Sequence, residues 1–404
     1  MTRRKKIILV LLGLAVLSQL PFAYRRYRLG RLNNAIQQLV PQRVAAPAES
    51  RFVDYKGVIH VHSFLGGHST GTFTEMIEAA KSNGLDFVIM TEHPQNDFDT
   101  SAMTLNGLHG GVLFINCNEV DTTSGDRLLL FPGSDAASNA ITKTTQQAID
   151  EQKARGGLAI IAYPDEFRSW QVNSFDGIEV YNLFTNTRRM NRVVTAFDAL
   201  WSYGTYPDLV FANFFQRPTD ELKQWDDLVA GGNRKIVATA GNDAHSNVGL
   251  SVNDSAGHQL LGIKLDPYER SFHVVRTHVL IEKGQPLTRD SLLKAIMHGR
   301  SYISFDIFGD GAGFTFTAQK DSRQTMMGDE VALSDGLRLK ASAPLACRFL
   351  LLRNGNVVGQ KSGERLMEFE IHEKGAYRVE AYLDSLPPPA NGKPWIISNP
   401  IYVR

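Results

Sequence analysis

The segment Val58–Thr72, which reads VIHVHSFLGGHSTGT, decides how this chain is interpreted. His60 and His62 end an apolar, strand-like run two residues apart, and alternate residues of a strand share a face. His68 follows in a glycine-rich loop that can turn back to the same point. Imidazole is a common ligand of transition metals, so the segment predicts a metal site. A pair of surface histidines on an edge strand is the alternative that these residues alone leave open.

Three further strand-like runs end in residue types that bind metals. His93 closes the apolar run FVIMTEH, and Glu119 closes LFINCNE. Asp243 and His245 follow the run IVATAGN, again two residues apart. Side chains at the carboxyl ends of strands converge on one site in α/β barrels. A single histidine at a strand end is more often exposed or structural, but the repeated pattern predicts a shared metal centre.

The order of these runs along the chain indicates the architecture. From Phe52 onward, strand-like runs alternate with helical spacings, which predicts a parallel sheet, open or closed into a barrel. From Asp306 the runs alternate apolar and polar residues, and Asn354-Gly355 is a strong hairpin signal. We therefore expect an N-terminal basic and apolar segment, a linker, an α/β barrel and a C-terminal antiparallel β-sandwich. Their expected bounds are residues 1–32, 33–51, 52–305 and 306–404.

The N-terminal segment has the pattern of a membrane anchor. Residues 1–31 hold eight of the 43 basic residues and no acidic residue, on both sides of the apolar run Ile7–Ala23. Pro21-Phe22-Ala23 matches a signal-peptide cleavage site poorly, so we expect an uncleaved single-pass anchor, with a cleaved signal as the alternative. We expect the body on the outer side of the cell membrane. The rest of the chain has 35 basic and 42 acidic residues, which argues against nucleic-acid binding.

At these motifs the chain resembles a known superfamily. HVHS at 60–63, TEH at 91–93, the strand-terminal Glu119 and GNDAHS at 241–246 occur in the order typical of the PHP (polymerase and histidinol phosphatase) superfamily of metal-dependent hydrolases. The resemblance covers roughly residues 52–305. The tail is similar to the branch that contains carbaryl hydrolase and related esterases. The resemblance implies a distorted (β/α)7 barrel ahead of the C-terminal β-sandwich.

The resemblance also implies how metals are held. It implies two divalent ions, and the donor types suit zinc, manganese or iron. The expected ligands of the first ion are His60, His62, Glu119 and Asp243. The expected ligands of the second are His68, His93 and His245. A third ion would share Glu119 with two histidines, but this chain has Asp126 and Tyr163 at those positions. Neutral tyrosine is a poor ligand, so we expect a third site that is lost or weak, with Asp126 as its remaining oxygen donor.

The expected function is hydrolysis of a small molecule by a metal-activated water. Glu119 and Asp243 are the expected catalytic carboxylates, since both bind metal and Asp243 can also carry a proton. Arg168, Arg188 and Tyr163 are expected to contact the substrate, with solvated surface roles as the alternative for the arginines. A phosphoesterase leads, and an esterase or carbamate/amide hydrolase with the same site is the alternative. A catalytically weakened binding or scaffold protein of the cell envelope is a third interpretation, because the third-site histidines are missing.

Overall fold

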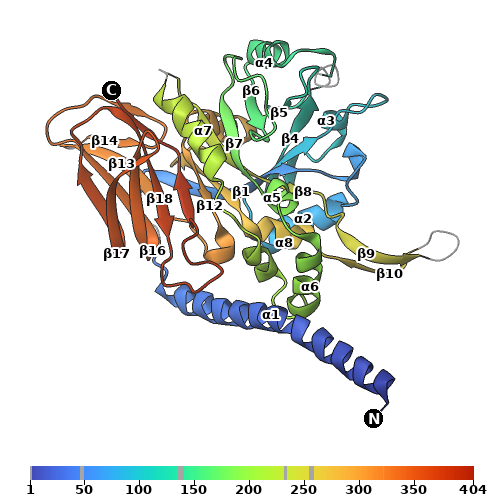
Figure 1. The fold of residues 1–404 in the computed structure, drawn as a ribbon. Coiled ribbons are helices and arrows are strands. Elements are labelled where there is room, and N and C mark those ends of the chain that lie inside the picture. The colour runs from blue at the N-terminus through green and yellow to red at the C-terminus, as the bar shows by residue number, and fades with distance from the viewer. Residues whose placement is uncertain (1, 46–49, 135–140, 232–233, 254–258, 322) are drawn as a thin grey trace.

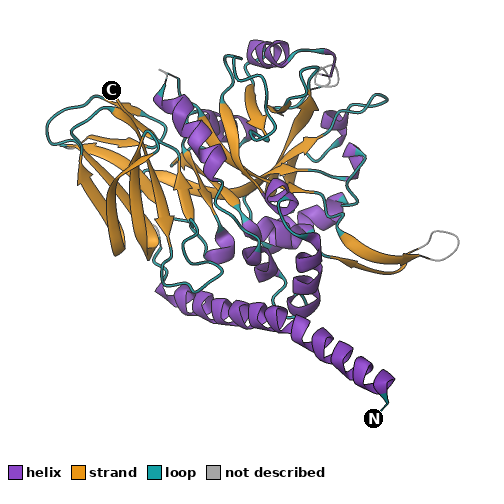
Figure 2. Cartoon of the chain, viewed as in Figure 1, coloured by secondary structure: helices purple, strands orange, loops and turns teal. Residues whose placement is uncertain are grey.

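The computed structural model describes residues 2–45, 50–134, 141–231, 234–253, 259–321 and 323–404. All but two of the described strands join one hydrogen-bonded sheet. Helices surround the part of this sheet nearest the middle of the molecule, while the C-terminal strands form a nearly helix-free block at one side (Figure 1, Figure 2). The long helix α1 (Arg3–Leu39) runs along the base of both parts.

Seven strands close a barrel. They are β1 (Phe52–Val61), β2 (Phe87–Glu92), β4 (Val112–Asp121), β5 (Arg127–Phe131), β6 (Leu158–Ala162), β7 (Gly177–Asn182) and β8 (Val237–Ala244). Each pairs with the next in this order, and β8 returns to pair with β1. Ile59, Ile115 and Ile160 from three of these strands pack in one buried cluster. Burial of each such side chain contributes roughly 1.5–3 kcal/mol, so the apolar runs both form and close the barrel.

The barrel is not the distorted (β/α)7 barrel that we expected. β5 runs antiparallel to both of its neighbours, β4 and β6. A short turn at 122–126 joins β4 to β5, and the fully described stretch 163–176 joins β6 to β7 without a helix. The runs RLLLF and LAIIA do form strands, but an apolar run carries no information about strand direction. The predicted fold class was therefore wrong. The alternation of strands and helices and the resemblance to the superfamily both predicted parallel strands, but β5 is antiparallel to its neighbours.

Several helices in this part begin where the sequence supplies a side-chain cap. α2 (Phe73–Ser82) begins after Thr72, whose hydroxyl forms a reciprocal capping box with Glu75. α4 (Thr145–Ala154) begins with the same arrangement. The other helices are η2 (Phe64–Gly66), α3 (Thr100–Met103), α5 (Leu183–Arg188), α6 (Arg192–Ser202), η4 (Asp208–Asn213), α7 (Thr219–Ala230), α8 (Tyr268–Val274) and α9 (Arg289–Met297). Between β7 and β8, the helices α5, α6 and η4 lie beside the end of β8, whereas α7 packs against β7 and β18 (Gly375–Tyr382).

The C-terminal strands are hydrogen-bonded to the barrel sheet. They therefore do not form the separate antiparallel sandwich that we expected. β11 (Arg276–Glu282) pairs with β1, β12 (Ser301–Ser304) pairs with β11, and β19 (Ile396–Ser398) pairs with β12. β15 and β20 pair in parallel. One apolar core runs through both parts.

The remaining elements are η1 (Val40–Gln42), β3 (Gly107–His109), β9 (Gly249–Asn253), β10 (Gln259–Lys264), η5 (Asp306–Phe308), β13 (Thr315–Lys320), β14 (Arg323–Met326), β15 (Glu330–Val331), β16 (Arg338–Arg353), β17 (Asn356–Glu370) and β20 (Ile401–Val403).

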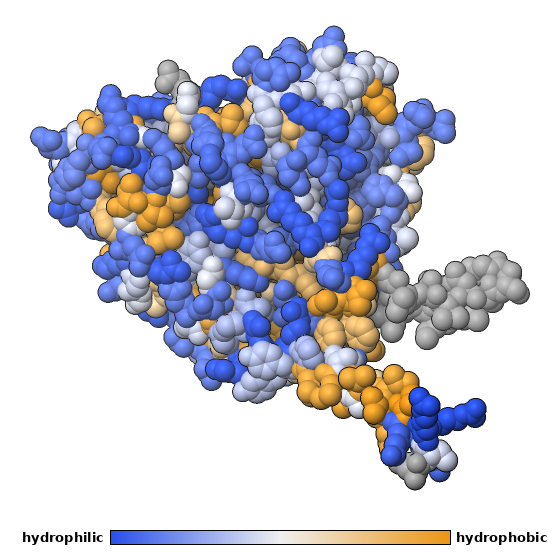
Figure 3. Space-filling model, in the orientation of Figure 1, coloured by the Kyte–Doolittle hydropathy of each residue, from blue (hydrophilic) through white to orange (hydrophobic). Residues whose placement is uncertain are grey.

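Helix α1 has two halves with different surroundings. The first half is exposed, and the helix is long and apolar enough to cross a membrane, a test that a signal sequence also passes. Figure 3 shows this half as an apolar arm with a hydrophilic tip. The second half lies on the body, where Leu29, Leu32 and Leu39 are buried. Residues 33–39, which we expected in the linker, therefore belong to α1, and part of that linker, 46–49, lies outside the described residues.

Candidate metal centre

Four buried side chains meet at the carboxyl ends of three barrel strands. They are His60, His62, Glu119 and Asp243. None is more than 4% exposed. Each offers one nitrogen or oxygen atom, and these atoms all lie within 4.8 Å of one another. This group, called the metal-donor cluster below, can hold a metal ion, and its members come from β1, β4, β8 and the residue after β1.

Unusual backbone conformations shape these strand ends. His60 has a φ of 68° and Asp243 a φ of 47°, both in the left-handed region that non-glycine residues rarely occupy. At His60 the strand carries an extra residue, because Ile59 and Val61 pair with consecutive residues of β2. This bulge, rather than the simple alternation expected from the sequence, brings His60 and His62 to the same point. Strained backbone of this kind is concentrated at functional sites.

The donor atoms are spaced like ligands of one cation. Nε2 of His60 and Nε2 of His62 lie 3.0 and 3.2 Å from Oε2 of Glu119. The same two nitrogens lie 3.5 and 3.4 Å from Oδ1 of Asp243. Ligands held about 2.1 Å from a tetrahedral ion are separated from one another by about 3.4 Å. The observed spacing therefore fits a single divalent ion.

Several atoms of the metal-donor cluster have no hydrogen-bond partner among the described residues. They include both ring nitrogens of His62, Oε1 of Glu119 and Oδ1 of Asp243. Each buried polar atom without a partner costs about 1–3 kcal/mol, so a concentration of them at one point is unfavourable. A bound cation removes much of this cost. The mixture of imidazole and carboxylate donors suits zinc, manganese or iron.

Electrostatics at the metal-donor cluster also favour a cation. Burial alone lowers the pKa of His60, but Glu179, Asp243 and Glu119 raise it well above its usual value. Burial alone also lowers the pKa of His62, but the neighbouring Asp243 and Glu119 raise it to about 9. Burial alone raises the pKa of Glu119 and of Asp243, but the histidines lower both below the usual range. The two carboxylates are ionised and attract either protons on the histidines or a metal in their place.

Three further histidines surround the metal-donor cluster. Nε2 of His93 lies 3.2 Å from Oε2 of Glu119, and Nε2 of His68 faces Nε2 of His245 at 2.6 Å. Burial lowers the pKa of His93 to about 3 and that of His245 to about 4. Both are therefore neutral, which is the form that binds metal. The structure thus places all seven ligands predicted from the sequence in one neighbourhood.

The sequence analysis missed Glu179, the residue that orients His60. Nδ1 of His60 donates a hydrogen bond to Oε1 of Glu179 at 2.7 Å, and Nδ2 of Asn182 donates to its Oε2 at 2.9 Å. A partner on Nδ1 fixes the ring and leaves Nε2 facing the other donors. Gly241 makes room for this contact, because a Cβ there would lie 1.8 Å from Oε1 of Glu179. The available signal was a glutamate inside the apolar run GIEVYN.

Tyr163 lies where the resemblance implies a histidine. Its hydroxyl donates a hydrogen bond to Oδ2 of Asp243 at 2.5 Å, and burial raises its pKa well above the usual value. Tyr163 is therefore a neutral proton donor to Asp243. Arg127, which the sequence analysis did not single out, lies 5.1 Å from the ring centre of Tyr163 and has Nη1 3.6 Å from Oε1 of Glu119. Its positive charge disfavours a third cation on this side of Glu119.

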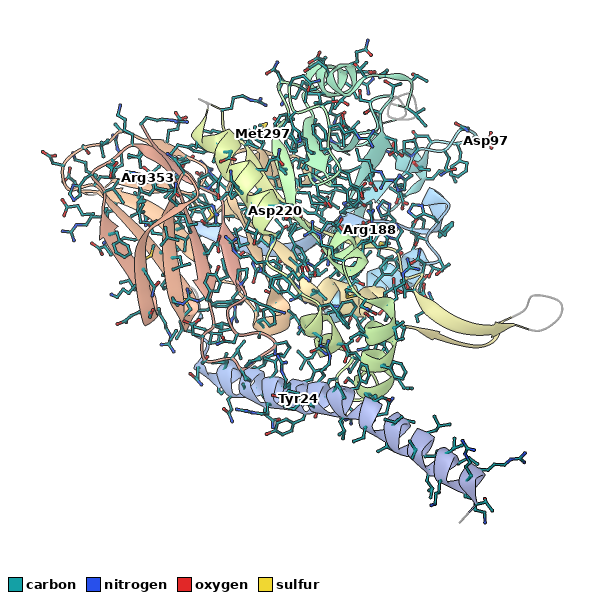
Figure 4. The ribbon with its side chains drawn as sticks, in the orientation of Figure 1. Tyr24, Asp97, Arg188, Asp220, Met297 and Arg353 are labelled. Atoms are coloured by element: carbon teal, nitrogen blue, oxygen red, sulfur yellow. The ribbon has the colours of Figure 1, made fainter. Side chains whose placement is uncertain are left out.

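Other residues predicted for the site have partners elsewhere. Oδ2 of Asp126 accepts a hydrogen bond from Thr145 at 2.6 Å, and Oδ1 accepts one from the backbone N–H of Arg168 at 2.7 Å. Asp126 therefore positions a loop, and we no longer assign it to a metal. Arg188, labelled at the end of α5 in Figure 4, pairs with Glu166 at 2.7 Å and lies half-exposed. Arg188 can still reach a ligand, because it lines the cavity described below.

A second group of metal-ligand residue types is already neutralised by the chain. It consists of His278, Asp306 and Asp310. Nδ1 of His278 lies 2.9 Å from Oδ1 of Asp54, and Nη1 of Arg276 donates to Oδ2 of Asp306 at 2.8 Å. Because arginine and histidine balance these carboxylates, the group is an ion-pair network that links β11 to β1 and η5.

A cavity of about 600 Å³ opens beside the metal-donor cluster, with Asp243 in its wall. It lies between α5, α6, η4 and the end of β8. Phe211 and Phe214 contribute to its mainly apolar walls, while Arg188 and Arg192 add positive charge. A volume of this size is typical of small-molecule sites, which bury apolar surface around a few polar groups.

Comparisons with known proteins do not identify a family. No protein-family model matches the chain, and no curated protein matches its sequence. Among solved structures, the crystal structure of PsfC from Pseudomonas syringae PB-5123 matches 62% of this chain and 91% of that one, with 12% sequence identity and a TM-score of 0.36. A likeness at this level carries no conclusion about fold or function.

Proposed function

We propose that this chain is a metal-dependent hydrolase that cleaves phosphate esters. The observation that carries the proposal is the metal-donor cluster, whose buried atoms are spaced for a cation and lack other partners. The adjoining cavity supports access by a substrate. The motif resemblance to the PHP superfamily supports hydrolysis as the reaction. The neighbouring donors of His68, His93 and His245 support two divalent ions, for which zinc, manganese and iron are the candidates.

The residues of the chain have separate roles in this proposal. A divalent metal, when bound, supplies hydroxide near neutral pH and polarises the phosphoryl oxygen. Glu179 holds His60 so that Nε2 faces the ligand position. The hydroxyl of Tyr163 occupies Oδ2 of Asp243, which leaves Oδ1 for the metal and makes Asp243 the candidate proton carrier. The position of Arg188 in the cavity wall supports a role in binding the anionic group of the substrate.

We also propose that α1 anchors the body to the cell membrane, with the body on the outer side. The exposed apolar half of α1 and the basic residues ahead of it support this arrangement. Protease treatment of intact cells tests the side. The body should be digested without cell lysis, and digestion only after lysis would place it inside.

The proposed activity is tested with the full-length protein purified in detergent and loaded with manganese or zinc. We expect hydrolysis of nitrophenyl phosphate, and its loss in Asp243→Asn. His298→Ala is the matched control, because His298 lies at the exposed end of α9, bonded to a backbone carbonyl. Turnover of nitrophenyl phosphate that survives in Asp243→Asn would contradict the proposed site.

An esterase or carbamate/amide hydrolase with the same site is the second candidate. The apolar walls of the cavity favour it, because a neutral ester needs fewer charged partners than a phosphate does. Hydrolysis of nitrophenyl acetate without hydrolysis of nitrophenyl phosphate would select this candidate. Purified protein with near-zero bound metal, after growth in metal-supplemented medium, would instead favour a binding or scaffold protein.

A further inference from the structure

The cavity beside Asp243 is shaped for an apolar chain rather than for a compact polar molecule. Its walls are mainly apolar, and they include Leu183, Ala196, Ala199, Val210, Phe211 and Phe214. Of the metal-donor cluster only Asp243 lies in the wall of the cavity, and its side chain is buried just behind that wall. Arg188 and Arg192 supply positive charge on its wall, and Arg192 makes no ion pair with any described residue. Asp266 also lines the cavity, but its two oxygens accept hydrogen bonds from the backbone N–H groups of Asn247 and Val248. An amphipathic ligand, with one anionic end and one long apolar end, matches this division.

One wall of the cavity is also the support of the membrane helix. Helix α6, which contributes Ala196 and Ala199 to the cavity, packs against α1. Phe22 stacks on Phe197 with ring centres 4.9 Å apart, and Arg25 donates to both oxygens of Asp198 at 2.7 and 2.8 Å. The contact continues to the point where α1 leaves the body, because Nε1 of Trp201 donates to Gln19 at 3.0 Å. The cavity is therefore one helix thickness from the proposed anchor.

The surface between the cavity and α1 is apolar as well. Val193 and Leu200 on α6 are 66% and 77% exposed. At about 100° per residue, these two side chains lie between the cavity face at Ala196 and the α1 face at Phe197. Figure 3 shows apolar surface continuing from the α1 arm onto the region where α6 lies in Figure 1. Exposed apolar patches of this kind mark contacts with membranes or with other partners, and the adjoining anchor favours the membrane.

We propose that the substrate of this site is a membrane lipid that carries a phosphomonoester. This inference rests on the proposed hydrolase function and names its substrate class. The strip formed by Val193 and Leu200 lies against the bilayer, the lipid chain occupies the cavity, and the phosphate reaches Asp243 past Arg188 and Arg192. In the reaction, a water oxygen forms a new bond to phosphorus, the bond from phosphorus to the lipid oxygen breaks, and that oxygen takes the proton. The products are inorganic phosphate and a lipid alcohol that remains in the membrane.

Chain recognition is tested with the full-length protein in detergent micelles and a tryptophan that fills the cavity. Ala199→Trp places an indole in the cavity wall, and Ala154→Trp, at the exposed end of α4, is the matched control. We measure binding of a pyrene-labelled alkyl phosphate to metal-free protein by fluorescence, and hydrolysis of hexadecyl and butyl phosphate by metal-loaded protein. We expect Ala199→Trp to weaken binding and to raise KM for hexadecyl phosphate by at least about 10-fold. Ala154→Trp should change neither the binding nor the KM for hexadecyl phosphate.

The outcomes separate this inference from the proposed function. Equal binding of the labelled alkyl phosphate by wild type and Ala199→Trp would overturn the lipid assignment, as would equal KM values of wild type for hexadecyl and butyl phosphate. Chain binding that Ala199→Trp abolishes, without hydrolysis of any phosphate by metal-loaded wild type, would support the chain site and overturn the phosphoesterase proposal.

Discussion

Two buried charge clusters in this molecule are built in opposite ways. The metal-donor cluster brings two histidines and two carboxylates together and leaves several of their atoms without partners. The second cluster, called the guanidinium cluster, lies between α7 and β18. Its members are Arg217, Asp226, Arg378 and Glu380. In this cluster every carboxylate oxygen accepts at least one hydrogen bond.

The guanidinium cluster needs no additional ligand. Nε and Nη2 of Arg378 donate to the two oxygens of Asp226, both at 2.8 Å, and Nη1 donates to Oε1 of Glu380 at 2.6 Å. Arg217 approaches Glu380 from the other side, with Nε 3.2 Å from Oε2. All carboxylate oxygens of the guanidinium cluster have partners, whereas several atoms of the metal-donor cluster have none. Burial of charge alone therefore does not indicate a metal site, but buried charge with unpaired donor atoms does.

The largest expected effect is on the metal-donor cluster. His60→Ala or Asp243→Ala should reduce bound metal to near zero and lower turnover by more than about 100-fold, because loss of a ligand exceeds the effect of losing a residue that only orients one. Metal content by elemental analysis and initial rates check this prediction. Wild-type rates in either variant would show that the site is misassigned, and His298→Ala should leave both quantities unchanged.

The guanidinium cluster should respond in stability and not in metal content. Arg378→Ala leaves Asp226 and Glu380 buried without their main partner, which should lower the free energy of unfolding by about 3–5 kcal/mol. Denaturant unfolding of the full-length protein in detergent, followed by circular dichroism, measures the change. Arg348→Ala, which removes a surface pair with Asp384, is the control and should cost at most about 1 kcal/mol. Equal losses in the two variants would contradict the account of this cluster.

A smaller effect is expected where a residue only orients a ligand. Glu179→Gln keeps the volume of the side chain but removes the charge that faces Nδ1 of His60. Metal affinity should fall by roughly 10-fold, which is the lower end for loss of such a partner. Competition with a chelator measures the affinity, and Glu166→Gln at the surface should have no effect on it. An unchanged affinity in Glu179→Gln would mean that the hydrogen bond to His60 does not organise the site.

The smallest effect concerns the stability of the guanidinium cluster in acid. Burial alone raises the pKa of Glu380, but Arg378 and Arg217 lower it to about 2. Because the folded-state pKa lies below the ordinary value, the stabilisation from this group is complete above about pH 4.5 and is lost as pH falls toward 2. Unfolding free energies between pH 5 and pH 3 should therefore decline less steeply in Glu380→Gln than in wild type. Identical slopes would show that Glu380 titrates normally in the folded protein.

The comparison also explains how much the sequence could predict. His60, His62, Glu119 and Asp243 stand out because apolar strands seldom end in ligand residues, and the structure does bring them together. Glu179 stood out only as a glutamate inside an apolar run, and its role depends on His60, a partner 119 residues away in the chain that the sequence does not identify. Tyr163 was noted as a departure from the histidine pattern and as a substrate contact, but its hydrogen bond to Asp243 was not predicted.

The fold was predicted less well than the candidate site. Apolar runs and capping residues located strands and helices, such as α2 after Thr72. Strand direction, however, depends on the length of each connection and on which neighbours the strand meets. The turn at 122–126 reverses the chain into β5, and the pairing of β12 with β19 merges the C-terminal strands with the barrel sheet. The first is a short glycine-containing connection typical of a hairpin, which our interpretation of the sequence did not use. The second is a long-range pairing that local patterns do not encode.

The most direct test is anomalous X-ray scattering at the zinc, manganese and iron edges, from crystals of full-length protein grown in metal-supplemented medium. We expect a peak between Nε2 of His60, Nε2 of His62, Oε2 of Glu119 and Oδ1 of Asp243. An empty position there, or an imidazole of His60 turned away from Asp243, would contradict it.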